Sequence, residues 1–234
     1  YSIPGIRVGW VASNTEVADI LRDYRDYTMI CAGVFDDMVA TLVLENKEAI
    51  LERNRQIVEE NLALMDEWIA KEPSSLGEEL LIIQKEFDGF SDTRERLDLL
   101  ALDKDGNLVV IENKLDDSGR NVTWQAIKYA SYCSSLTKQD VIDIYQKYLG
   151  ETASAEESLS DFFDGRDLSD VEINIGNSQR IFFVAAHFRK EVTSSVMWLL
   201  NFNLRIKCFK VTPFLYNDKI LLDFDQIIPI KDAD

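Results

Sequence analysis

The residues that decide the fold are Arg94-Glu-Arg-Leu-Asp-Leu-Leu-Ala-Leu-Asp-Lys-Asp-Gly-Asn-Leu-Val-Val-Ile-Glu-Asn-Lys114. Two apolar runs flank Asp103-Lys-Asp-Gly106, a sequence that favours a type I turn followed by a glycine in the left-handed conformation. The pattern predicts two antiparallel strands, residues 96–102 and 108–114, joined by a three-residue loop. Away from their acids both strands are apolar on both faces, so we expect helices on both sides of the sheet.

The turn also predicts which residues of the two strands face one another. The expected opposed pairs are Asp103 with Asn107, Leu100 with Val110, Asp98 with Glu112, and Arg96 with Lys114. Opposed side chains lie about 5 Å apart at Cβ, and like charges there are destabilising. Two facing carboxylates persist best with a cation between them, and a divalent metal ion is the obvious candidate. Lys114 shares a strand face with Glu112 because strands alternate with period two.

A cross-strand ion network is the alternative explanation of these acids. Arg96 and Lys114 could neutralise Asp98 and Glu112 without any metal. Ion networks are common in proteins, and the pattern by itself does not decide between the network and a metal site.

The composition restricts the class of protein. The chain has 234 residues, of which 46% are hydrophobic, and its 25 basic and 42 acidic residues give a formal charge of −17. This charge argues against indiscriminate binding of nucleic acid, although an acidic enzyme can act on it through a local basic surface and a bound metal. No apolar run is long enough to cross a membrane, and no signal peptide is evident. We expect a cytoplasmic protein with reduced cysteines.

Hydrophobic periodicity predicts a helical beginning and an α/β remainder. Helices are expected at residues 17–27, 35–44, 47–70, 122–136, 139–149 and 192–202, with one more short helix within the acidic stretch 151–170. Strands are expected at 6–11, 80–87, 180–187, 205–212 and 219–224, besides the two of the central hairpin. Pro73-Ser-Ser-Leu-Gly77 ends the long helix and divides the chain into residues 1–72 and 73–234. The apolar stripe of that helix could pair two copies of the chain as a homodimer.

The first part of the chain resembles a fragment of class I pyridoxal-phosphate aminotransferases. The resemblance rests on Tyr1-Ser-Ile-Pro-Gly-Ile-Arg-Val-Gly-Trp10 and on Ile50-Leu-Glu-Arg-Asn-Arg-Gln-Ile-Val-Glu-Glu-Asn-Leu62. In that family Arg7 would contact the cofactor phosphate. The Schiff-base lysine, however, would precede Tyr1 and is absent, so we expect no pyridoxal phosphate here and interpret the segment as a helical remnant.

From about residue 66 to the end, the chain resembles the PD-(D/E)XK nuclease superfamily. An aspartate on one strand, Glu-x-Lys on the next and Gln-x-x-x-Tyr on the following helix carry the resemblance, here Asp98, Glu112-Asn-Lys114 and Gln125-Ala-Ile-Lys-Tyr129. Uncharacterised bacterial members are most similar, and RecB-like and NucS-type nucleases more distantly. The resemblance implies an α/β fold, with a central mixed sheet flanked by helices on both faces.

The resemblance also implies an activity, the Mg²⁺- or Mn²⁺-dependent hydrolysis of phosphodiester bonds in nucleic acid, with DNA favoured over RNA. Asp98 and Glu112 would bind the metal, and Lys114 would position the attacking water or stabilise the developing charge. Gln125 and Tyr129 lie one helical turn apart and would border the metal. In a different fold they would be an ordinary helix face. The alternative function is a nuclease fold kept as a catalytically silent binding module.

Further expectations concern the surroundings of the site. Superfamily members often add a glutamate from the helix before the first strand, for which Glu78 and Glu79 are the nearest candidates. The superfamily usually has an apolar residue at the position of Asn113, so its polarity suggests an exposed or edge strand. The remaining notable side chains are assigned to packing, namely Trp124, Trp198, Cys133, Cys208 and the single histidine, His187.

Overall fold

The structure is a computed structural model that describes residues 11–28, 33–89, 96–117 and 122–230. Its packing divides the chain into two compact units, residues 1–60 and 61–234. The first unit contains α1 (Thr15–Thr28), α2 (Val34–Glu45) and the beginning of α3 (Lys47–Lys71), which confirms the three predicted helices. The predicted strand 6–11 and the aminotransferase-like segment with Arg7 lie outside the described residues, apart from Val11.

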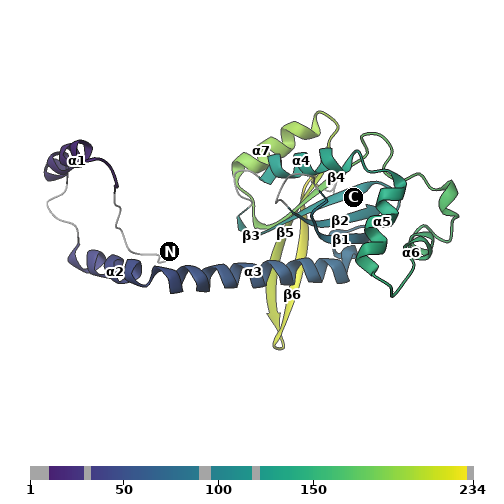
Figure 1. The fold of residues 1–234 in the computed structure, drawn as a ribbon, viewed down its shortest axis with the longest axis horizontal. Coiled ribbons are helices and arrows are strands. Elements are labelled where there is room, and N and C mark those ends of the chain that lie inside the picture. Colours follow the sequence, from purple (N-terminus) through teal and green to yellow (C-terminus); the bar gives the residue numbers. More distant parts are fainter. Residues whose placement is uncertain (1–10, 29–32, 90–95, 118–121, 231–234) are drawn as a thin grey trace. The chain divides into compact units, whose positions relative to one another are not determined.

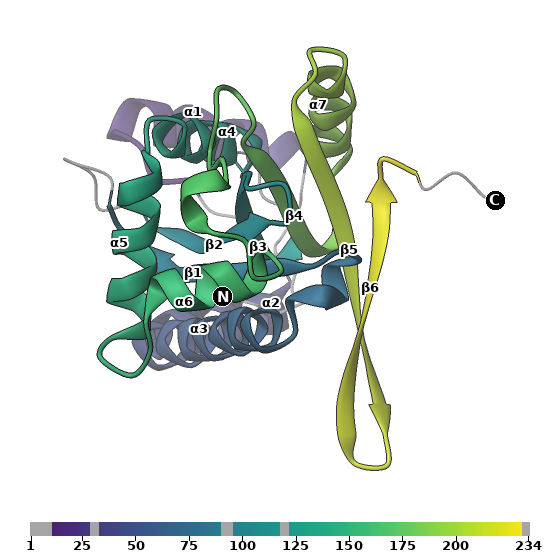
Figure 2. The ribbon, with the colours of Figure 1, turned by 90° about the vertical axis from the view of Figure 1, so that its right-hand side faces the viewer.

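The second unit is built on a six-stranded mixed sheet (Figures 1 and 2). The strands follow one another in chain order from β1 to β6; β3, β4 and β5 are parallel, and the other neighbours are antiparallel. This confirms the predicted α/β fold with a mixed sheet. The elements are η1 (Pro73–Leu76), β1 (Leu80–Phe87), β2 (Leu97–Asp103), β3 (Leu108–Asp117), α4 (Val122–Cys133), α5 (Lys138–Leu149), α6 (Ala155–Phe162), η2 (Leu168–Asp170), β4 (Arg180–His187), α7 (Lys190–Leu200), β5 (Arg205–Tyr216) and β6 (Lys219–Ile228).

Helices cover both faces of this sheet, as the apolar strands predict. On one face Leu100 and Val110 pack with residues of α4, α5 and α6, and α7 continues this layer over β4 and β5. On the other face Leu99 packs with Met65 and Ile69 from the last part of α3. Residues 61–71 of α3 therefore belong to the core of the sheet unit, because that face of the sheet has an apolar surface to bury.

The central hairpin has the predicted turn. The backbone N–H of Gly106 donates to the carbonyl of Asp103, and the N–H of Asp103 donates to the carbonyl of Asn107, both at 3.0 Å. Gly106 has φ +81°, the left-handed conformation that glycine adopts without steric cost. Leu100 lies opposite Val110, which confirms the predicted register.

Several boundaries differ from those predicted. The strand β5 runs to Tyr216, because it continues with β6 as a two-stranded ribbon beyond the part that pairs with β4. The strand β6 runs to Ile228, because its last residues pair with the part of β5 that lies beside β4. The helix α4 ends at Cys133 rather than at residue 136. The predicted helix 139–149 is present as α5, which begins after Thr137, and the side chains of Thr137 and Asp140 form a capping box. This pair satisfies N–H groups that would otherwise lack partners at the start of α5.

Some assignments of side chains to packing are wrong. Trp124 and Trp198 are 69% and 60% exposed, and His187 is also exposed, because these positions fall on outer helix faces and at a strand end. Cys133 and Cys208 are buried free thiols as predicted, and burial raises the pKa of each to about 12. No helix within the described ranges is long and apolar enough to cross a membrane.

Candidate functional site

The strands β2 and β3 bring Asp98 and Glu112 to the same end of the sheet. Their paired residues run as far as Leu99 opposite Ile111, one position before the two acids. Asp98 Oδ2 accepts a hydrogen bond from the backbone N–H of Asn113 at 2.7 Å. The side chain of Asp98 is thus held against the residue next to Glu112.

Glu112 is a buried acid without hydrogen bonds to the described part of the chain. Glu112 has no exposed surface, and neither of its carboxylate oxygens accepts a hydrogen bond from a described residue. Lys114 Nζ lies 3.4 Å from Glu112 Oε2, an ion pair without the alignment of a hydrogen bond. Burial, and then repulsion by Asp98, raises the pKa of Glu112 to about 8. Burial also raises the pKa of Asp98.

Only half of the alternative ion network is present. Lys114 pairs with Glu112, but Arg96 lies before the start of β2 and forms an ion pair with Glu86 at 3.1 Å. The expected pairing of Arg96 with Lys114 is therefore absent from the ladder of β2 and β3, whose described pairs end at Leu99 and Ile111. Among the described residues, the cation that acts on both acids is Lys114, whose side chain is partly exposed.

Gln125 and Tyr129 share one face of α4 and are bonded to each other. Gln125 Nε2 donates to Tyr129 Oη at 2.9 Å, and the hydroxyl of Tyr129 donates to the backbone carbonyl of Arg96 at 3.0 Å. Tyr129 is fully buried, so its hydroxyl ties α4 to the chain two residues before Asp98. Tyr129 therefore connects α4 to the backbone that leads into the strand carrying Asp98.

Asp66 is a third acid beside the site, which the sequence reasoning did not identify. Its carboxylate accepts a hydrogen bond from the side-chain amide of Asn113. Burial raises the pKa of Asp66 to about 6; the Asn113 hydrogen bond opposes this rise, and repulsion by Asp98 adds to it. In the sequence, Asp66 stands between Met65 and Ile69 of the apolar helix stripe, and both of these are buried. An acid in such a stripe needs a polar partner, and this could have identified Asp66.

The three acids do not form a three-ligand metal group. Among the described residues, no set of three or more His, Cys, Asp or Glu side chains has a spacing that could hold a metal ion. The reason lies in the alternation along β3: Glu112 and Lys114 point to one face, and Asn113 points to the face covered by α3, where Asp66 lies. The expectation that Asn113 marks an exposed or edge strand is wrong, because Asn113 is fully buried and β3 lies between β2 and β4.

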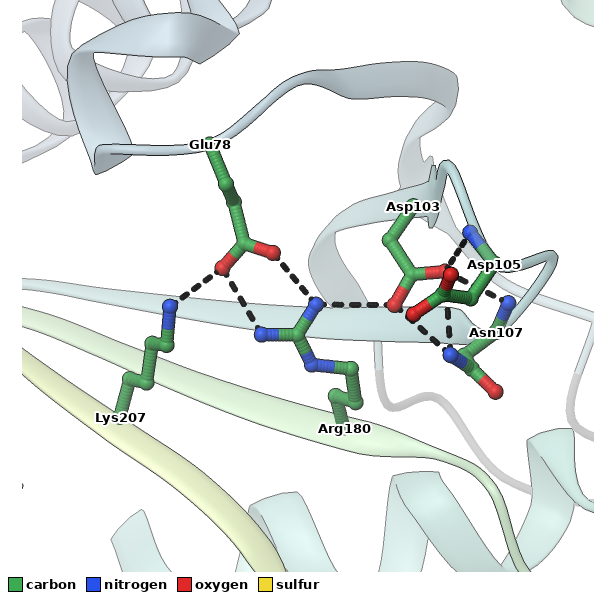
Figure 3. A network of polar contacts seen from close by, with 6 residues as sticks. All are labelled: Glu78, Asp103, Asp105, Asn107, Arg180 and Lys207. Atoms are coloured by element: carbon green, nitrogen blue, oxygen red, sulfur yellow. Dashed lines mark hydrogen bonds and ion pairs between the residues drawn. The ribbon is translucent and has the colours of Figure 1, made fainter. Parts of the chain in front are cut away.

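Glu78 and Glu79 take part in contacts elsewhere. Glu78 accepts hydrogen bonds from Arg180 at 2.6 and 2.8 Å and from Lys207 at 2.6 Å, and Arg180 also donates to Asp103 at 2.8 Å (Figure 3). Burial raises the pKa of Glu78, but these hydrogen bonds lower it below its usual value overall. Glu79 pairs with Lys104 at 3.2 Å. Both glutamates therefore join the turn end of the hairpin to its neighbours.

Comparison with known proteins gives a weak likeness to two endonuclease structures. No protein-family model and no curated protein matches the chain. The structure of an EndoMS–dsDNA complex matches with 16% sequence identity and a TM-score of 0.36, over 63% of this chain and 44% of that chain. A repair endonuclease from Pyrococcus abyssi matches with 18% identity and a TM-score of 0.34, over 63% of this chain and 46% of that one. The chain spans less than half the length of either protein.

At these identities and TM-scores the likeness does not indicate a function, so any function must be inferred from the residues of this chain. The resemblance of residues 1–72 to aminotransferases has no matching family model and stays a prediction.

Proposed function

We propose that this chain is a metal-dependent nuclease that hydrolyses phosphodiester bonds of nucleic acid, with DNA favoured over RNA. The observation that carries the proposal is the state of Glu112, a fully buried acid whose oxygens accept no hydrogen bond from a described residue. A buried carboxylate is costly unless its charge is compensated, and the ion pair with Lys114 leaves the pKa of Glu112 raised. Asp98 repels the same group and raises its pKa further. A bound cation would remove both penalties.

The donor set fits Mg²⁺ or Mn²⁺. Asp98 and Glu112 offer hard carboxylate oxygens, the ligands that these ions prefer, and water and a substrate phosphate would complete the coordination. When bound, the ion would supply a polarised phosphoryl oxygen and a water of lowered pKa.

Lys114 is the cation that this chain itself brings to the reaction. Its side chain is 30% exposed, while its ammonium lies 3.4 Å from the buried carboxylate of Glu112. It can therefore contact both solvent and the acid pair, as required of a group that positions water or stabilises charge on a phosphate. Gln125 and Tyr129 would act indirectly, by fixing α4 against the backbone that leads into Asp98.

A catalytically silent binding module is the second candidate. Two observations favour it: the absence of a three-ligand metal group among the described residues, and a pKa of about 8 that leaves Glu112 mostly protonated at neutral pH. In this function the acids of β2 and β3 would be stabilised by protonation and by Lys114, and the protein would bind its partner without cleaving it.

Cleavage of labelled oligonucleotides separates the two candidates. Single- and double-stranded DNA and RNA are incubated with the full chain and millimolar Mg²⁺ or Mn²⁺. We expect cleavage of DNA and a loss of at least about 100-fold for Asp98→Asn, Glu112→Gln and Lys114→Ala. Glu79→Gln is the matched control, because Glu79 is a largely exposed acid bonded away from the site, and it should cleave like the wild type.

Two results would contradict the nuclease proposal. The first is equal cleavage by Lys114→Ala and the wild type, which removes the catalytic assignment. The second is the absence of cleavage together with the absence of binding heat and of any thermal shift at millimolar metal, which favours the binding module.

A further inference from the structure

The strands β5 and β6 extend past the rest of the sheet as a two-stranded ribbon. β4 pairs with β5 only over residues 205–210, whereas β5 and β6 remain paired as far as Tyr216 opposite Lys219. Figure 2 shows this ribbon projecting below the other strands. Leu222 and Phe224 of β6 pack against the core beside α3. A two-stranded ribbon is marginally stable in water by itself, so the part nearer the tip calls for a further packing partner.

The ribbon exposes apolar side chains on both of its faces. Its exposed members are Phe214, Leu215, Tyr216, Ile220 and Leu221, each with more than half of its surface accessible. Contiguous apolar residues on a projecting element mark an interaction surface more often than a solvated one. The outer edge of β6 also pairs with no other strand in the described part of the chain, and its backbone groups are available for another strand.

The sequence of β6 is complementary to itself in the antiparallel direction. In Lys219-Ile-Leu-Leu-Asp223, a two-fold axis at Leu221 places Lys219 opposite Asp223 and Ile220 opposite Leu222 of the second copy. Leu221 then faces its own equivalent. Neither Lys219 nor Asp223 forms an ion pair with another described residue, so both charges are available for this contact.

Other registers of the same edge are less favourable. An axis at Leu222 would place Leu221 opposite Asp223, and an axis at Asp223 would place two like charges face to face. An axis between Leu221 and Leu222 would place Ile220 opposite Asp223 and mix the two faces of the ribbon. The axis at Leu222 would also pair Lys219 with Asp225, but of these registers only the axis at Leu221 gives two opposite-charge pairs with apolar residues alone between them.

We propose that β6 pairs with β6 of a second copy of this chain, antiparallel about Leu221, so that the two ribbons form one four-stranded sheet. The contact is isologous, as in most two-fold dimers. It uses the outer edge of β6 rather than the apolar stripe of the 47–70 helix, and it does not depend on the proposed nuclease activity.

Charge exchange across the axis tests the pairing in the full chain. Light scattering and sedimentation equilibrium should give about twice the 26.8 kDa of one chain. Lys219→Asp and Asp223→Lys, each placing two like-charge pairs in the dimer, should weaken association at least about tenfold. The double variant should restore it. Asp225→Lys is the matched control, because it is the same change on the same strand beyond the paired residues, and it should not weaken the dimer.

A cysteine pair gives a second readout that does not depend on charge. In a Cys31→Ser background, Leu221→Cys should form an intermolecular disulfide on mild oxidation, because residues opposed in an antiparallel pair have Cα atoms roughly 4.5–5.5 Å apart. Phe214→Cys should not, although Phe214 lies directly opposite Leu221 on β5. In the proposed dimer its two copies are three strand spacings, about 14 Å, apart.

Circular dichroism checks that each variant is folded. A monomeric wild type, a dimer unaffected by the single charge changes, a double variant that stays monomeric, or equal cross-linking by the two cysteine variants would each overturn the proposal.

Discussion

Asp66 and Asn113 are 47 positions apart in the sequence and are joined by a hydrogen bond from the amide of Asn113 to the carboxylate of Asp66. Asn113 also donates its backbone N–H to Asp98. One residue of β3 therefore contacts two acids, one on the helix α3 and one on the strand β2. The polar residue between Glu112 and Lys114 is explained by this contact rather than by exposure to solvent.

Replacing Asn113 by leucine removes only the contact with Asp66. The backbone N–H to Asp98 remains, so we expect metal-dependent cleavage to persist. At pH 8, where Asp66 is ionised, the lost hydrogen bond should cost about 1.5–3 kcal/mol in the free energy of unfolding. A double-mutant cycle with Asp66→Ala, followed by urea denaturation, measures this coupling. Additive effects of the two substitutions would contradict the assigned contact.

Stability should fall as pH rises through the range in which Glu112 titrates. Its pKa is about 8 in the folded chain and near 4.5 in an unfolded one, so the folded state binds more protons between these values. The stabilisation by protonation is complete below about pH 4.5, is lost progressively up to about pH 8, and changes little above. Asp98 and Asp66, whose pKa values are also raised, act in the same direction.

Glu112→Gln isolates this effect. Melting temperatures measured without metal from pH 5 to 9 should fall less steeply for this variant than for the wild type, and Glu79→Gln should follow the wild type. Mg²⁺ or Mn²⁺ must displace the proton of Glu112, so metal affinity should increase over the same range. Equal slopes for Glu112→Gln and the wild type would show that Glu112 is not protonated in the folded chain.

The sequence predicts this hairpin well because its determinants are local. Asp103-Lys-Asp-Gly106 specifies a turn type, and the turn then specifies the opposed residues as far as Leu99 and Ile111, one position before the acids. The role of Asp66 depends on how α3 packs across the sheet, and no spacing along the chain encodes that contact.

The contacts of Glu78 and Glu79 were mispredicted for a similar reason. Glu78 and Glu79 immediately precede β1 in the sequence, which makes them candidates for the site. Both, however, lie at the turn end of the hairpin, where Leu80 of β1 pairs with Asp103. The acids of the site lie at the opposite end of β2. The direction of a strand therefore decides which neighbours in the sequence are neighbours of the site.

The network around Glu78 should contribute measurably to stability. Its carboxylate accepts hydrogen bonds from Arg180 and Lys207, whose side chains are largely buried. Glu78→Ala leaves these two cations without that partner and should cost about 2 kcal/mol in the free energy of unfolding. Glu79→Ala breaks an exposed ion pair and should leave stability unchanged within error, as urea denaturation can measure. Equal losses for the two variants would contradict a stabilising network.

Substitution of Gly106, in the turn between β2 and β3, should destabilise the fold for two separable reasons. Its φ of +81° strains any other residue, and a Cβ there would lie 2.1 Å from the backbone carbonyl oxygen of Glu172. Gly165 has a similar φ of +75° but no atom within 4 Å of such a Cβ. Gly165→Ala should therefore cost only the backbone strain, roughly 1–2 kcal/mol.

Gly106→Ala should cost that strain and, in addition, about 1–3 kcal/mol for displacing the segment that carries Glu172. The carbonyl of Gly106 also accepts a hydrogen bond from the N–H of Asn174 at 2.8 Å, so moving this segment would disturb a second contact. Urea denaturation of the two variants side by side measures the difference. If Gly165→Ala were as destabilising as Gly106→Ala, the close approach of residue 172 to the turn would contribute nothing to the stability of the hairpin.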